Sequence, residues 1–424
     1  MGRTPSGRGR RDGDAELARI ERDGAAAIRR EIAGLASDDI VEVEMEAGSL
    51  LGDWRATWPD ERKPLDAFGT AILRRLGAMD DPDVFALLLA VSAIAEPPLD
   101  AVAREGVARL RAAGVPEPLW SRSVGQPTLV DAWISTDPLE DQSNVVSVWS
   151  YGGRMHGLIA MVDYNFRGLI RHIGVTPDPD GYREEWRTKS GMPIRPLSEQ
   201  DLADRLANGV EMFDVYLDPP VYDEVPGLIP LVRARLRLLP TPRPIEVREV
   251  PEKERRRIVR EFVASPEAAG LGRVRDDRPA GKGRRSSWPA AEVADSFVDF
   301  ACDYGAGDPL RWSPIAVEIL LADWLPGKAI LSPAEINALP DVLRAFVRYC
   351  ARLKGLAPDE VAETLEAIDQ FAGDFAAGMA DDEAAGQAKR LGKELLASGI
   401  DLTDADAVQT FMSRWDAEER DPAR

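Results

Sequence analysis

The sequence predicts an α+β protein that is predominantly α-helical, with an N-terminal helical region, a small antiparallel β-meander and a C-terminal helical bundle. Three observations lead to this fold class. Apolar residues recur at helical spacing towards both ends of the chain. Between these regions, residues 129–175 hold four apolar segments that turn residues separate. A stretch over 265–288 is rich in Gly, Pro, Arg and Ser, has no apolar period, and predicts a linker.

These patterns divide the chain into five segments with different expected structures. The first is too rich in Arg and Gly to fold, so we expect it to be disordered. The others alternate between helical, sheet-forming and linker composition. In order, they are a disordered basic tail (1–14), a helical region (15–122), an antiparallel sheet with covering helices (123–264), a flexible linker or loop (265–288) and a C-terminal helical bundle (289–420).

Five amphipathic segments predict the helical region. Apolar residues recur every three or four positions along them, as on one face of a helix. The fourth segment is apolar around its whole circumference from Val84 to Ile94, and we expect it to be a central, buried helix. The five segments lie at about 16–35, 40–58, 64–78, 82–95 and 98–113.

Two of these segments share a short internal similarity. Gly69–Gly77 and Gly106–Gly114 have Gly, Ala, Leu, Arg and Gly at matching positions, with an offset of 37 residues. Such a period is typical of paired-helix repeats. Because two copies are too few for a stable repeat array, a compact helical bundle is the favoured interpretation.

Four segments rich in Val, Ile and aromatic residues predict an antiparallel meander. Gly152 and Gly153 suit a two-residue hairpin loop because both can take positive φ. Asp163–Gly168 supplies the next reversal. Ser198 begins a helix that we expect to cover one sheet face, and a further helix is predicted around 228–238. The strands are predicted at 129–134, 144–151, 155–163 and 169–175.

Helical patterns return in the C-terminal bundle. Ser332 and Glu335 form a capping box with Pro333 at the first helical position, which marks a helix N-terminus. A continuous apolar stripe runs from Val361 to Met379. Two further helices are predicted near 383–397 and 404–418.

The charge balance argues against a surface built for nucleic acid. The 424 residues include 73 acidic and 53 basic side chains, which gives a formal net charge of −20. A protein that coats itself in phosphate backbone has the opposite balance. The acidic excess indicates solubility or a partner with a basic surface.

Cysteine usage and hydropathy favour a cytoplasmic protein. The two cysteines, Cys302 and Cys350, form no CxxC pair, so neither a thiolate zinc site nor a redox motif is expected. The first residues lack the apolar segment of a signal peptide. The longest apolar run, Phe85–Ala95, is too short to cross a bilayer.

The sequence contains no Walker A loop, no GxGxxG after a strand, no HExxH and no GxSxG. One constellation of chemically active residues remains. Both histidines of the chain, His156 and His172, fall within the meander, with Asp163 between them. Two imidazoles and a carboxylate could bind a metal or act as acid and base.

The spacing of these residues favours separate structural roles. Asp163 lies seven residues from His156, so their side chains point to opposite faces of a regular strand. A reversal centred between Asn165 and Phe166 leaves the two histidines about three residues out of register, or about 10 Å. We therefore expect Asp163 and Asn165 to shape a turn, each histidine to fill a strand position, and no metal or other cofactor to bind.

Two basic clusters lie at Arg3–Arg11 and Lys253–Arg285. Within the second, Arg255, Arg256 and Arg257 are the candidate phosphate-binding residues. Charge runs of this kind are more often solvated faces or loops, so nucleic-acid binding is the less favoured interpretation.

Two stretches carry a resemblance to other proteins: GRMHGLIAMVDYN over 153–165 and PLRWSPIAVEILLADWLP over 309–326. They resemble a group of uncharacterised proteins from high-GC actinobacteria, and the Ala-, Arg-, Asp- and Gly-rich composition agrees with such a source. The likeness extends from about residue 40 to about residue 415. The group has no assigned activity, so the resemblance implies no catalytic or binding residue.

The leading hypothesis is a non-enzymatic cytoplasmic interaction or regulatory protein that binds protein partners through helical surfaces. One alternative is a metal-dependent or acid–base enzyme with a site on the β-meander. A second is a nucleic-acid-associated protein that uses its basic segments. We expect another protein as the partner, neither nucleic acid nor a membrane, and the sequence leaves the oligomeric state open.

Overall fold

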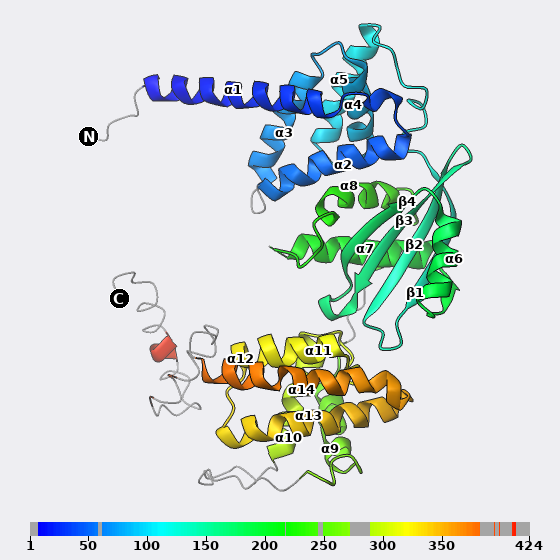
Figure 1. Cartoon of the computed structure of the whole chain (residues 1–424). Coiled ribbons are helices and arrows are strands. Elements are labelled where there is room, and N and C mark those ends of the chain that lie inside the picture. The colour runs from blue at the N-terminus through cyan, green and yellow to red at the C-terminus, as the bar shows by residue number, and fades with distance from the viewer. Residues whose placement is uncertain are drawn as a thin grey trace. The chain divides into compact units, whose positions relative to one another are not determined.

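The computed structural model describes residues 7–57, 62–216, 218–244, 249–271 and 289–381, together with 394, 398 and 409–412. Helices dominate the described residues and one antiparallel sheet lies among them, so the predicted α+β, predominantly helical class is confirmed (Figure 1). The chain forms two compact units. Unit 1 comprises Met1–Asp137, Gln142–Asp163 and Gly168–Ile245, and unit 2 comprises Pro138–Asp141, Tyr164–Arg167 and Glu246–Arg424.

Unit 1 begins with the five predicted helices. The fourth, α4, is the buried centre: nine of its 13 residues are buried, and Asp81 caps it by accepting from the backbone N–H groups of Asp83 and Val84. A short 3₁₀ turn, η1 (Leu35–Ser37), separates the first two helices. The five helices are α1 (Gly7–Glu31), α2 (Ile40–Thr57), α3 (Arg62–Leu76), α4 (Pro82–Ile94) and α5 (Leu99–Ala112).

Glycines set the closest helix contacts of unit 1. A Cβ on Gly77, which follows α3, would lie 3.0 Å from the Cα of Gly106 in α5. Glycines of the two similar segments therefore meet at a packing contact within a bundle. A Cβ on Gly52 of α2 would lie 2.6 Å from the backbone nitrogen of Gly227 in α8 (Val225–Leu236), so these two helices cross with their backbones almost touching.

The four predicted strands are confirmed as an antiparallel meander. Gly152 and Gly153 both have positive φ in the hairpin loop between the second and third strands, as predicted. A fifth strand that the sequence analysis did not predict pairs with the first. The strands are β1 (Thr128–Thr136), β2 (Gln142–Tyr151), β3 (Arg154–Asp163), β4 (Leu169–Thr176) and β5 (Ile194–Pro196), in the spatial order β4-β3-β2-β1-β5.

Helices cover both faces of the sheet (Figure 1). On one face lie α8 and α7 (Glu199–Val215), whose N-terminus is capped by Ser198 as predicted. On the other lies α6 (Pro179–Lys189), whose Tyr182 ring stacks on Trp133 of β1. Side chains alternate along β3, so neighbouring residues face different covering helices. His156 contacts Arg235 of α8, whereas a Cβ on Gly157 would lie 3.3 Å from Pro179 of α6.

Unit 2 is a helical bundle with an aromatic core. Phe346 lies at its centre, with ring centroids 5.0 Å from Phe262, 5.7 Å from Phe297 and 5.8 Å from Trp312. The predicted capping box at Ser332 is present. The bundle consists of α9 (Glu252–Val263), α10 (Pro289–Asp303), α11 (Pro314–Glu318), the π-helical η3 (Ile319–Trp324), α12 (Leu325–Lys328), α13 (Pro333–Lys354) and α14 (Pro358–Ala380).

Several sequence predictions fall partly or wholly outside the described residues. The basic tail at 1–14 is described only from residue 7, and there the prediction of disorder is wrong, because residues 7–14 continue α1 towards the N-terminus. The linker at 265–288 is described only to residue 271. The two helices predicted near 383–397 and 404–418 lie there too, apart from residues 394 and 409–412. The predicted boundary between a helical region and a sheet region at 122/123 falls inside unit 1.

Candidate functional site

The two histidines lie apart, on opposite faces of the sheet. His156 of β3 pairs with Trp149 of β2, whereas His172 of β4 pairs with Met161, five residues along β3 from His156. At ~3.3 Å per residue this separates them by about 16 Å along the strand. His156 is 3% exposed, and the His172 side chain is 48% exposed. The structure therefore keeps them independent, as the spacing predicts.

The offset is larger than the predicted three residues, and the reason is local. Close to the loop, Asp163 pairs with Leu169, so the reversal is centred on Phe166. A bulge between Met161 and Val162 on one side then leaves Arg171 as an extra residue of β4. Both changes move His172 further from His156 along β3.

His156 belongs to a buried polar network between α2, α8 and the sheet. The Arg235 Nη2 lies 2.6 Å from the Glu44 Oε2, and the Tyr151 hydroxyl donates to Glu44 Oε1 over 2.6 Å. The Arg235 Nη2 also lies 3.2 Å from the His156 Nε2. The Glu44 and Arg235 side chains are 0% and 1% exposed. This network joins two helices to two strands inside unit 1.

The chemistry of the network makes His156 a neutral acceptor. A guanidinium keeps its protons, so Arg235 donates and the His156 Nε2 accepts, which assigns the ring proton to Nδ1. Burial, reinforced by the charge of Arg235, lowers the pKa of His156 to about 4. The ring stacks on Tyr151 with centroids 5.7 Å apart. A neutral imidazole enclosed in this way has a structural role in the network.

Asp163 lies on the other side of β3 from His156 and has a separate set of partners. It is fully buried, and its Oδ2 accepts from the Arg171 Nη1 and from the Gln142 Nε2, both over 3.1 Å. Its backbone carbonyl accepts from the Gly168 N–H over 2.9 Å, which closes the reversal. Asp163 therefore stabilises the β3–β4 turn in two ways. Its backbone carbonyl bonds to Gly168, and its side chain bonds to the side chains of Arg171 and Gln142.

His172 has a partly exposed environment of its own. Its Nδ1 lies 3.4 Å from the Glu224 Oε1, and its ring centroid lies 5.6 Å from that of Tyr222. Across the described ranges, no group of three or more His, Cys, Asp or Glu side chains could hold a metal ion. His156, His172 and Asp163 consequently form three separate environments.

The three candidate arginines of α9 are engaged with carboxylates. Arg255 contacts Asp299 and Asp303 of α10 over 3.0 and 2.5 Å, and the hydrogen bond that Arg255 donates to Asp303 raises the pKa of Arg255. Arg256 pairs with Glu252 one turn earlier. Arg257 has looser contacts, 3.7 Å to Glu254 and 3.9 Å to Glu261. Arg255 therefore has a structural role between α9 and α10, and Arg256 and Arg257 each have a carboxylate of their own helix as a neighbour.

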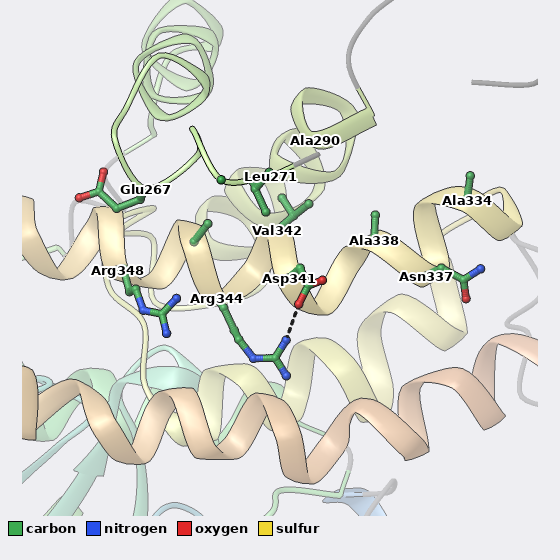
Figure 2. A pocket seen from close by; sticks show the side chains of 12 residues that line it. Glu267, Leu271, Ala290, Ala334, Asn337, Ala338, Asp341, Val342, Arg344 and Arg348 are labelled. Atoms are coloured by element: carbon green, nitrogen blue, oxygen red, sulfur yellow. Dashed lines mark hydrogen bonds and ion pairs between the residues drawn. The ribbon is translucent and has the colours of Figure 1, made fainter. Parts of the chain in front are cut away.

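A groove of about 700 Å³ runs along the outer face of α13 in unit 2 (Figure 2). Small and apolar side chains form its floor, and charged or polar side chains form its rim. The floor is built from Leu271, Ala290, Ala334, Ala338, Val342 and Ala345, and the rim from Glu267, Asn337, Asp341, Arg344 and Arg348. Of these, Glu267, Leu271 and Ala290 come from the segment after α9 and from α10, opposite the α13 side chains (Figure 2).

Ion pairs satisfy most of the rim. Arg344 contacts Asp341 over 2.8 Å and also Asp369 of α14. Glu267 accepts two hydrogen bonds from Arg352, over 2.6 and 3.2 Å, and this bonding lowers the pKa of Glu267 to about 2. Arg348 is exposed, and within the described part of the chain it has no hydrogen bond or ion pair. The groove therefore presents one guanidinium that is available to a ligand.

Sequence reasoning missed both the groove and the buried pair, although each left a signal. Glu44 falls four residues after Ile40 and three before Ala47, so it occupies the apolar stripe of α2. A charged residue at such a position indicates a buried partner. On α13 the small residues that line the groove, Ala334, Ala338 and Ala345, recur on one side of the helix, and a search for catalytic motifs does not examine such spacing.

Comparison of the chain with protein-family models, with curated proteins and with solved structures finds no match in any of the three. The resemblance to an actinobacterial group stays a prediction. Within the described residues, no helix is long and apolar enough to cross a membrane.

Proposed function

We propose that the chain is a non-enzymatic interaction protein of the cytoplasm, and that an α-helix of a protein partner lies in the groove along α13. The observation that carries this proposal is the groove itself. It has an apolar floor, a polar rim and one guanidinium, Arg348, that no described residue pairs with. An apolar centre with a polar border is the usual anatomy of a protein interface.

The dimensions of the groove fit a helix. Its α13 side extends from Ala334 to Arg348, which at ~1.5 Å per residue is about 21 Å, or roughly four helical turns. Three of the four α13 residues in the floor, Ala334, Ala338 and Ala345, present only methyl groups, and Val342 is the fourth. Small side chains let two helix axes approach to about 8 Å, the short end of the usual range. An amphipathic helix that fills such a groove is a recurrent mode of recognition.

The other candidate sites favour this proposal over the two alternatives. His156 is enclosed in a hydrogen-bonded network and lies about 16 Å along the strand from His172. Neither histidine lines the groove. A surface that binds the phosphates of a nucleic acid needs guanidinium groups that are not already paired. In α9, Arg255 is bound to two aspartates and Arg256 to a glutamate.

Site-specific photo-cross-linking in the source cells tests the proposal. A photoreactive benzoylphenylalanine at Asn337, on the rim, should yield one discrete cross-linked protein that mass spectrometry identifies. Ala338→Trp, which fills the floor, should abolish this product. A photoreactive residue at Glu363, exposed on α14 and outside the groove, is the matched control. Absence of a product at Asn337, or the same products at both positions, would contradict the proposal.

A further inference from the structure

A second hollow of unit 2, a pocket of about 310 Å³, lies along α9. Three basic side chains, one carboxylate and the proline that precedes the helix line it. These residues are Lys253, Arg257, Arg260, Glu254 and Pro251. None of them lines the groove along α13, so the pocket is a separate feature. Its volume is at the low end of the range for ligand sites and fits a small molecule.

The three basic residues of the pocket lie on one face of α9. They are four and three residues apart, which places them within roughly 60° of one another around the helix axis. From Lys253 to Arg260 they extend over about 10 Å along the axis. Lysine and arginine side chains are long and flexible enough to converge on one group over this distance.

Two of the three cations are available to a ligand. Lys253 and Arg260 are exposed, and neither has a hydrogen bond or ion pair with another described residue. Arg257 has only long contacts, 3.7 Å to Glu254 and 3.9 Å to Glu261. The basic face of α9 therefore keeps most of its capacity to donate hydrogen bonds.

The charges that line the pocket match one doubly charged anion. Three cations and the carboxylate of Glu254 leave a local net charge of +2. A phosphate monoester carries about −2 near neutral pH and has three acceptor oxygens, whereas each phosphate of a nucleic acid carries a single negative charge. A nucleic acid would also meet the net charge of −20 of the whole chain. A small anion meets mainly the charges within about 10 Å, because salt screens the others.

From these observations we propose that the pocket on α9 binds the phosphate monoester group of a small molecule. Lys253 and Arg260 supply the first contacts, since no described residue pairs with them. Arg257 joins them when its side chain turns from the two glutamates to the ligand. The planar guanidinium of an arginine can bond two oxygens of one phosphate at once. This site is independent of the helix-binding groove and of the function proposed for it.

Calorimetric titration of the full chain with glycerol 2-phosphate at low salt tests the proposal. One saturable site is expected, with an affinity that falls as salt is added. Lys253→Ala and Arg260→Ala should each weaken binding about tenfold, because each removes one charge-assisted hydrogen-bonding partner. Arg256→Ala is the matched control. It also removes an exposed arginine of α9, but one that is paired with Glu252 and lies outside the pocket, so it should bind like the wild type.

Three results would overturn the proposal, provided that circular dichroism shows each variant to be folded. They are no saturable binding, an equal loss of affinity in Arg256→Ala, and equally tight binding of dimethyl phosphate, a diester with a single charge. Preferential binding of duplex DNA would replace the proposal with the nucleic-acid alternative. Vesicles that contain phosphatidic acid present the same monoester as a lipid headgroup. Binding to these vesicles that Arg260→Ala removes would support the site and identify a lipid as the source of the phosphate.

Discussion

The buried imidazole of His156 should make unit 1 sensitive to mild acid. Its pKa in the folded protein is lowered to about 4, from 6.5 for an unperturbed histidine. Between these values the unfolded chain takes up a proton that the folded chain refuses. The stabilising contribution is therefore fully present above pH 6.5, is lost as the pH falls through this window, and changes no further below pH 4.

The magnitude follows from the two pKa values. One pKa unit corresponds to about 1.4 kcal/mol, so a change from pH 7 to pH 5 should lower the free energy of unfolding of unit 1 by about 2 kcal/mol through this group. His156→Gln keeps an acceptor for Arg235 but cannot titrate, so it should lose none of this component. His172→Gln, which removes the other histidine and leaves His156 in place, is the matched control and should retain this component.

Two measurements check the prediction. The chain has only two histidines, so a proton NMR titration of the tag-free protein shows two imidazole signals, and His172→Gln assigns them. Urea-dependent hydrogen exchange of the β3 peptide at pH 7 and pH 5 gives the free energy. A His156 pKa near 6.5, or an equal loss of stability in His156→Gln, would refute the reasoning.

The other predictions concern the packing of helices and the buried charges. Arg235→Met should destabilise unit 1 by about 3–5 kcal/mol in urea unfolding, because it leaves the carboxyl group of Glu44 buried without its cation. The double variant Glu44→Met/Arg235→Met should recover most of that loss. If it recovers none, the loss in Arg235→Met arises from altered side-chain packing and not from the unpaired carboxyl group of Glu44. Gly52→Ala should cost about 1–3 kcal/mol through contact with Gly227, whereas Gly373→Ala, in an open position of α14, should stabilise the chain by about 0.5–1 kcal/mol in thermal unfolding. Equal effects at the two glycines would contradict the close-crossing argument.

Periodicity was sufficient for the elements that bury a regular face. The four meander strands and helices α1 to α5 follow from apolar spacing alone, since burial of that face determines which elements form. Elements with a weak pattern were missed. β5 has three residues and ends at Pro196, and in α6 the half-buried Tyr182 and Trp186 lie among charged neighbours. α9 was not predicted, because its residues were interpreted as part of a basic cluster.

The site depended on details that a local pattern does not contain. The register of His172 changed because Arg171 forms a bulge, and its guanidinium bonds both Asp163 and the carbonyl of Pro220, 49 residues away. Glu44 and Arg235 are 191 residues apart, so only the fold brings them together. Parity along a single strand was reliable, because it needs no long-range information. It correctly placed His156 and Asp163 on opposite faces.

The buried pair and the glycine contact complement each other at the crossing of α2 and α8. Gly52 and Gly227 allow the two backbones to approach closely, because neither residue has a Cβ at the crossing. The guanidinium of Arg235 has a fixed donor geometry, and its bond to Glu44 fixes one axial position. Tyr151 and His156 then tie that position to the sheet. We therefore infer that the charges specify the register of the two helices, and that the glycines permit their close approach at this crossing.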